Sequence, residues 1–155
     1  MAELALTRSV DDRRRYELDG VGSIRRVGLF SRGAELHTVT GRMLNARSRG
    51  FAGRTSDATD EASGTVGQFV QAWKLKRTGT LTWRGLPHEV TTESSWRNRY
   101  LLSRDGRALL TVQCRGWGRT PARLTVHDDT LDPGLALFTT WLVQQFVESD
   151  AAAAS

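Results

Sequence analysis

The stretch LDPGLALFTTWLVQQFV, from Leu131 to Val147, decides the fold because it predicts a helix that is apolar on every side. Its one charged residue is Asp132, which can cap the first turn, and Pro133 has the fixed φ that suits the first helical position. Successive helical residues are about 100° apart, so the leucines, valines and aromatic residues of this stretch surround the axis. We therefore expect a helix over 132–148 that is buried all round.

Two environments can bury such a helix, a protein core and a bilayer. The apolar run from Leu135 to Val147 is shorter than the roughly 20 residues that a membrane span needs. We therefore predict a core helix and keep a short membrane anchor as the alternative.

The chain before this helix is rich in β-forming residues, alternates in polarity and is divided by glycine turns such as Arg84-Gly85 and Asp105-Gly106. This pattern is typical of antiparallel hairpins. We predict ten strands, at Tyr16 to Leu18, Ile24 to Phe30, Glu35 to Thr40, Arg42 to Ala46, Val66 to Lys76, Leu81 to Arg84, His88 to Thr92, Arg97 to Ser103, Ala108 to Arg115 and Ala122 to His127.

A flat sheet cannot cover every side of an apolar helix, so the sheet has to curl around it. The predicted fold class is mainly β, a closed antiparallel barrel of about 10–12 strands wrapped around a central, C-terminal hydrophobic helix. We assign 16–148 to this single domain, 1–15 to a flexible basic arm and 149–155 to a disordered tail. The segment 47–64 lacks periodicity and is predicted to be a mobile loop.

Net charge and cysteine content limit the classes of partner and the cellular compartment that we expect. The chain has 155 residues and a formal net charge of +5, which favours phosphate-bearing partners such as nucleic acid or anionic lipid. Its one cysteine, Cys114, excludes an internal disulfide and a CxxC motif, and strand alternation predicts that its thiol points inward. These features favour a cytoplasmic protein, and the basic run at 13–15 lacks the apolar segment of an export signal.

The sequence contains no motif for catalysis or metal binding that we can identify. The three histidines, His37, His88 and His127, have no metal-ligand spacing, and no nucleophile elbow, phosphate-binding loop or pair of catalytic carboxylates is visible. We therefore predict a protein that is not an enzyme and has no catalytic residues, no metal and no cofactor.

The best candidate for an anion site is Lys74-Leu75-Lys76-Arg77, because alternation places Lys74 and Lys76 on one face of a strand and Arg77 begins the turn. Arg97 and Arg99 are also two residues apart and complete the predicted ligand-binding set. The alternative is that these cations only solvate the outer face of the barrel. Five tryptophans could stack on nucleic-acid bases, although in a small barrel they are expected to pack in the core.

Four short stretches carry a resemblance to a known superfamily: Tyr16-Glu17-Leu18-Asp19-Gly20, Tyr100-Leu101-Leu102 leading to Asp105-Gly106, Gly116-Trp117-Gly118-Arg119-Thr120-Pro121, and Leu131-Asp132-Pro133-Gly134. Together with the terminal helix they resemble the tubby-like C-terminal domain superfamily, which includes LURP-one-related proteins and phospholipid scramblases, and especially its short actinobacterial members. The resemblance implies a barrel of about twelve strands on an apolar helix. It also implies phosphoinositide binding through basic surface residues. The chain departs from the scramblases, since it has no cysteine cluster for lipidation, no EF-hand-like loop and no flanking apolar span.

The expected function is that of a non-catalytic domain that binds anionic lipid headgroups or another anionic ligand. A nucleic-acid-binding barrel and a structural subunit that meets a protein partner are the alternatives. We expect an anionic membrane surface or a protein as the partner ahead of a nucleic acid, and a cytoplasmic or peripheral membrane location.

Overall fold

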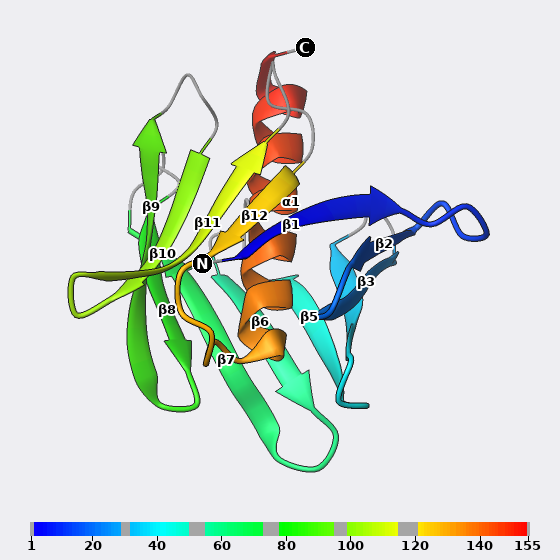
Figure 1. Ribbon diagram of the computed structural model, residues 1–155, viewed down its shortest axis with the longest axis horizontal. Coiled ribbons are helices and arrows are strands. Elements are labelled where there is room, and N and C mark those ends of the chain that lie inside the picture. The colour runs from blue at the N-terminus through cyan, green and yellow to red at the C-terminus, as the bar shows by residue number, and fades with distance from the viewer. Residues whose placement is uncertain are drawn as a thin grey trace.

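The computed structural model describes residues 2–28, 32–49, 55–72, 78–94, 99–114 and 121–154. Twelve strands are followed by one helix (Figure 1). The elements are β1 (Ala2–Arg8), β2 (Arg15–Leu18), β3 (Gly22–Val27), β4 (Gly33–Thr38), β5 (Met43–Arg49), β6 (Thr55–Asp60), β7 (Gly64–Gln71), β8 (Gly79–Trp83), β9 (Leu86–Ser94), β10 (Arg99–Arg104), β11 (Arg107–Cys114), β12 (Pro121–Val126) and α1 (Pro133–Ala154).

The strands form a closed antiparallel barrel in which each strand pairs with its neighbours in the sequence, and β1 closes the ring between β12 and β2. Leu4 and Leu6 of β1 pack against the core, while the other residues of β1 are exposed. The expected flexible arm over 1–15 is therefore wrong for β1, and the barrel begins at Ala2. The apolar residues of β1 are placed in the barrel by pairing with β12, which is distant in the sequence.

The helix α1 passes through the barrel (Figure 1), and it is buried on every side over much of its length, as predicted. Every residue from Gly134 to Gln144 is buried. The hydroxyl groups of Thr139 and Thr140 donate to the carbonyl oxygens of Leu135 and Ala136, each at 2.8 Å, so these buried polar groups are satisfied within the helix. The predicted fold class, a closed barrel around a C-terminal helix, is confirmed.

Aromatic side chains fill the space between α1 and the wall. The ring of Phe138 lies 5.8 Å from the rings of both Trp83 and Trp141. Further along the helix, Phe146 lies 5.5 Å from Phe69 and 5.7 Å from Tyr100. These separations are those of favourable aromatic pairs, so the helix supplies bulk that the strands do not need to provide.

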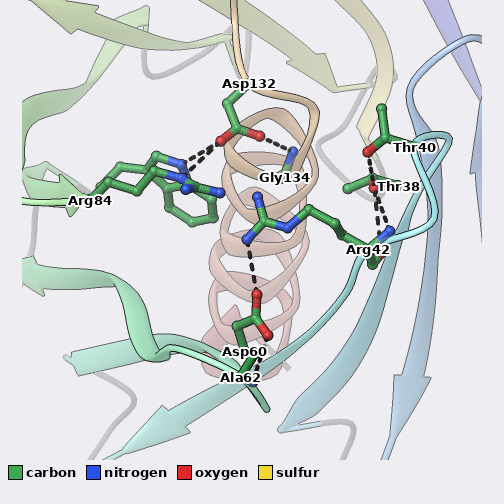
Figure 2. A network of polar contacts seen from close by, with 9 residues as sticks. Thr38, Thr40, Arg42, Asp60, Ala62, Arg84, Asp132 and Gly134 are labelled. Carbon is green, nitrogen blue, oxygen red and sulfur yellow. Dashed lines mark hydrogen bonds and ion pairs between the residues drawn. The ribbon is translucent and has the colours of Figure 1, made fainter.

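Asp132 fixes the start of α1 to the barrel (Figure 2). Its Oδ1 accepts a hydrogen bond from the backbone amide of Gly134 at 2.8 Å, as expected of a helix cap. Its Oδ2 accepts a hydrogen bond from Trp83 Nε1 at 3.0 Å and lies 3.3 Å from Nε of Arg84. One carboxylate thus joins the helix to the end of β8 and the turn that follows it.

A second polar contact fixes the helix near the other end of the barrel. The guanidinium of Arg26 on β3 is buried inside the wall and forms an ion pair with Glu148 of α1. The predicted disordered tail over 149–155 is wrong for 149–154, because α1 continues to Ala154. Alanine has the highest helix propensity, and an existing helix can be extended without a new nucleation step.

The predicted mobile loop over 47–64 is also wrong where it is described. β5 extends to Arg49, and β6 pairs along its whole length with β5 and β7. The β6 sequence, TSDATD, is poor in β-forming residues, but Ala58 has to be small because the Trp83 ring lies over the neighbouring Gly67. The bulk at this position comes from Trp83 on β8, two strands away, so β6 shows no apolar alternation in the sequence.

The other strand predictions agree with the structure to within a few residues. Each predicted strand overlaps an observed one, and the parts at 29–30, 73–76, 97–98 and 115 lie outside the described residues. Asp105 and Gly106 both have positive φ, at 52° and 75°, as the predicted hairpin turn requires. Leu109 differs from the alternation and is buried, because the register of β10 and β11 shifts at that point. Among the described residues, no helix has the length and apolar character needed to span a membrane.

A substitution at Gly22 tests the close packing of β3 against β4. It has a φ of 152°, and a Cβ added to it would overlap the carbonyl oxygen of His37 on β4. We expect Gly22→Ala to lower the free energy of unfolding by at least about 2 kcal/mol more than Gly20→Ala. Gly20 is the matched control, since its φ is 75° but an added Cβ would have open space. Equal midpoints for the two variants in urea would contradict the described β3–β4 register.

Asp132 gives a second prediction. Asp132→Ala removes the cap of Gly134 and leaves Trp83 Nε1 without its acceptor, so we expect a loss of about 2–4 kcal/mol in unfolding free energy. Glu61→Ala is the control, because Glu61 is an exposed acid in a turn. Thermal melting followed by circular dichroism measures both variants, and an unchanged midpoint for Asp132→Ala would refute the anchoring role.

Candidate functional site

A basic hollow lies on the outer face of the barrel across β3, β4, β5 and β6. Its volume is about 510 Å³. Alternation along β5 turns Arg47 and Arg49 outward while Leu44 and Ala46 are buried. The residues around it are Val27, Gly28, Arg32, Gly33, Ala34, Asn45, Ala46, Arg47, Ser48, Arg49, Asp57 and Thr59.

The strand register creates the hollow by placing a glycine and an acid on either side of Arg47. Gly33 on β4 and Asp57 on β6 are its partners on the two neighbouring strands. Because Gly33 has no side chain, its position on β4 contributes no bulk beside Arg47, which is exposed and lines the hollow. Arg32 is exposed just before β4, so its charge adds to that of Arg47 at the same hollow.

Asp57 is the unusual residue of this hollow because its carboxylate is outward-facing yet buried. Its side chain is 8% exposed, and its Oδ2 forms an ion pair with Nε of Arg49 at 2.7 Å. Its Oδ1 is buried and has no hydrogen-bond donor among the described residues. A buried carboxylate oxygen without a donor is costly, so a ligand group that donates to it would be stabilised.

The arginines of the hollow differ from most others on the barrel. Within the described part of the chain, Arg32 and Arg47 have no ion-pair partner, whereas Arg49 is paired. Ion pairs also engage Arg25, Arg26, Arg42, Arg84, Arg99, Arg104 and Arg107. The hollow therefore has two cations available for an anion from outside.

A second hollow, of about 550 Å³, lies beside the start of α1. Three arginines surround it, but Arg84 pairs with Asp132, Arg104 with Asp105 and Arg107 with Asp128. Hydrogen bonds from Thr130 further hold the pKa of Asp128 below its usual value, with a smaller contribution from Arg107. The charges of this hollow are balanced internally, so it is the weaker candidate for an anion.

The predicted ligand-binding set is not brought together by the described residues. Lys74, Lys76, Arg77 and Arg97 lie outside them. Arg99, the remaining member, is at the start of β10, where its guanidinium lies 3.6 Å from the carboxylate of Glu93. That set stays a prediction.

Sequence reasoning missed the arginines of the hollow although the signal was present. Arg47 and Arg49 are two residues apart, which is the same spacing that singled out Lys74 and Lys76. The prediction of a mobile loop over 47–64 excludes them from the candidate set, because alternation has no meaning in a loop. Asp57 gives no signal in the sequence, since its burial depends on the neighbouring strands.

The described residues provide no site for metal or thiol chemistry. No three histidine, cysteine, aspartate or glutamate side chains in the described ranges group closely enough to hold a metal ion. Burial raises the pKa of the Cys114 thiol to about 12, so at neutral pH it is protonated and a poor nucleophile. A comparison of the chain with protein families, curated proteins and solved structures gives no match.

Cys114 gives a prediction about reactivity and pH. At pH 8 the native thiol should react with a thiol reagent at least about a hundredfold more slowly than the unfolded chain. Because the native pKa of Cys114 is raised from 9.0 to about 12, the unfolded state loses its proton first, and this contribution to stability is lost as the pH rises above 9. Urea unfolding at pH 8 and pH 10, compared with Cys114→Ala, measures this effect; identical pH slopes would rule it out.

Proposed function

We propose that this protein is a non-catalytic binding domain whose basic hollow holds an anionic ligand of the phosphorylated polyol class, such as the headgroup of a phosphoinositide. The observation that carries the proposal is the pair of arginines, Arg32 and Arg47, that border the hollow without an ion-pair partner among the described residues. A guanidinium binds phosphate through charge-assisted hydrogen bonds, often two at once. The tubby-like resemblance of the sequence points to the same class of ligand.

Asp57 supports a polyol phosphate over a simple phosphate. A phosphate group offers mainly acceptors at neutral pH and would be repelled by the carboxylate. A neighbouring hydroxyl group could donate to the buried Oδ1 of Asp57 while the phosphate contacts Arg47, its register partner. Thr59, Asn45 and Ser48 add neutral polar groups to the same hollow.

The alternatives have less support among the described residues. Binding of single-stranded nucleic acid favours exposed aromatic platforms, but Trp83 and Trp141 are buried. The large apolar side chains that are exposed in the described ranges, Val10, Val39, Val70 and Leu86, are aliphatic. No feature of the described residues favours a protein partner over an anionic ligand.

Calorimetric titration with inositol trisphosphate tests the proposal. We expect Arg32→Glu and Arg47→Glu each to weaken binding at least about tenfold, because each reversal replaces an attraction by a repulsion. Arg123→Glu is the matched control, since Arg123 is exposed on β12 and is not part of the hollow. No binding by the unchanged protein, or equal losses in all three variants, would refute the site.

In the same titration, Asp57→Asn tests whether the carboxylate of Asp57 selects a polyol phosphate over inorganic phosphate. Removing the carboxylate should strengthen the binding of inorganic phosphate, because a like charge is lost, while the preference for inositol trisphosphate over phosphate should shrink. An unchanged preference would refute the role of Asp57. Steep salt dependence toward duplex DNA, with no binding of either phosphate compound, would instead favour the nucleic-acid alternative.

A further inference from the structure

The turn between β1 and β2, residues 9–14, is a built element that projects from the wall of the barrel (Figure 1). The backbone amide of Ser9 donates to the Arg15 carbonyl at 2.9 Å, and the amide of Arg15 donates to the Asp12 carbonyl at 3.0 Å. Asp12 Oδ1 accepts from the amide of Arg14, and its Oδ2 accepts from Nε of Arg25 on β3, both at 2.9 Å. The turn is thus held in one shape against β3.

The charge of this turn is positive and directed outward. Arg8, Arg13, Arg14 and Arg15 are all exposed, and none has an ion-pair partner among the described residues. Asp12 does not offset them, because its charge is engaged by Arg25. Hydrogen bonds from the Arg14 amide and then from Arg25 hold the pKa of Asp12 below its usual value. Asp11 is the one other acid of the turn.

Val10 stands at the tip of this basic turn and is 98% exposed, more than any other large apolar side chain described. Nothing in the turn requires a valine, since Val10 packs against no part of the core. An apolar side chain on a rigid tip, surrounded by arginines, matches the layered chemistry of an anionic bilayer, with phosphates outside and hydrocarbon beneath.

We propose that the β1–β2 turn, from Arg8 to Arg15, docks the protein on an anionic membrane, with Val10 entering the boundary between headgroups and acyl chains. The arginines contact the lipid phosphates around it. This inference does not depend on the hollow, because the turn would dock whether or not the hollow binds a headgroup.

The distribution of charge between the two ends of the barrel agrees with docking through the β1–β2 turn. β1 starts opposite Val126, near the beginning of α1, and runs toward the other end, so the β1–β2 turn lies far from the start of the helix. The end at which α1 begins carries three exposed acids without an ion-pair partner among the described residues, Asp19, Glu61 and Asp129, beside other acids there that are paired with arginines. Docking through the β1–β2 turn directs those acids away from the anionic surface.

The turn and the hollow are neighbours along β3. The backbone amide of Arg26, next to the hollow residue Val27, donates a hydrogen bond to the Arg14 carbonyl.

A fluorescent label at the tip tests insertion. In Val10→Cys, an environment-sensitive dye attaches at position 10, because the buried thiol of Cys114 does not compete. With vesicles of phosphatidylcholine and phosphatidylserine we expect a blue shift and a rise in emission, and with phosphatidylcholine alone no change. Val39→Cys is the matched control, since Val39 is a 60% exposed valine in the β4–β5 turn near the start of α1. No shift at position 10, or equal shifts at both positions, would overturn the proposal.

Co-sedimentation with the same vesicles tests the charges. We expect Arg13→Glu/Arg14→Glu to lower vesicle binding at least about tenfold and Arg123→Glu to leave it nearly unchanged. Arg47→Glu separates the two proposals, because it should weaken inositol trisphosphate binding at least about tenfold, while the label at position 10 in the same variant should still respond to phosphatidylserine. Unchanged vesicle binding in the double variant would overturn membrane docking. Membrane docking would also be overturned if Arg13→Glu/Arg14→Glu weakened the binding of duplex DNA or of a protein partner but not the binding of vesicles.

Discussion

The burial of α1 on every side is the constraint on which the rest of this structure depends. A helix with apolar residues all round cannot rest on an open sheet, because one side would stay in water. The wall therefore has to close, and β1 closes it by pairing with both β12 and β2. Asp132 and the pair of Arg26 with Glu148 then fix the helix along its axis, one near each end.

Because α1 fills the interior of the barrel, a ligand can bind only on the outside of the molecule. The space that other barrels offer to a ligand is filled here by Phe138, Trp141 and Phe146. What remains is the outer face and the turns, where most arginines of the strands are neutralised by nearby acids. Apart from Arg123 on β12, the exceptions among the described residues lie in two places, the hollow at Arg32 and Arg47 and the β1–β2 turn. A surface ion pair contributes little to stability, so the distribution of unpaired cations carries more information about binding than their number.

The sequence predicted the fold where a residue's neighbours along the chain determine its environment. Alternation located β11 and the inward Cys114, and the apolar run located α1. It failed where the environment is supplied by distant residues: β1 depends on β12, and β6 consists of small and polar residues because Trp83 and the helix occupy the space inside. The hollow was missed for the same reason, since the register that brings Gly33, Arg47 and Asp57 together exists only once β6 is recognised as a strand.

The direction of α1 also helps to explain why the two ends of the barrel differ in charge. The first turn of a helix carries partial positive charge from its unpaired amides, which stabilises Asp132 directly and favours acids such as Asp128 nearby. Further along the helix, Arg26 lies within the wall and pairs with Glu148, six residues before α1 ends at Ala154. Arg42, Arg84, Arg104 and Arg107 are paired with acids near the start of the helix, whereas the unpaired arginines of the β1–β2 turn and of the hollow lie toward the other end. These unpaired arginines are therefore the part of the surface that can orient the protein toward an anionic partner.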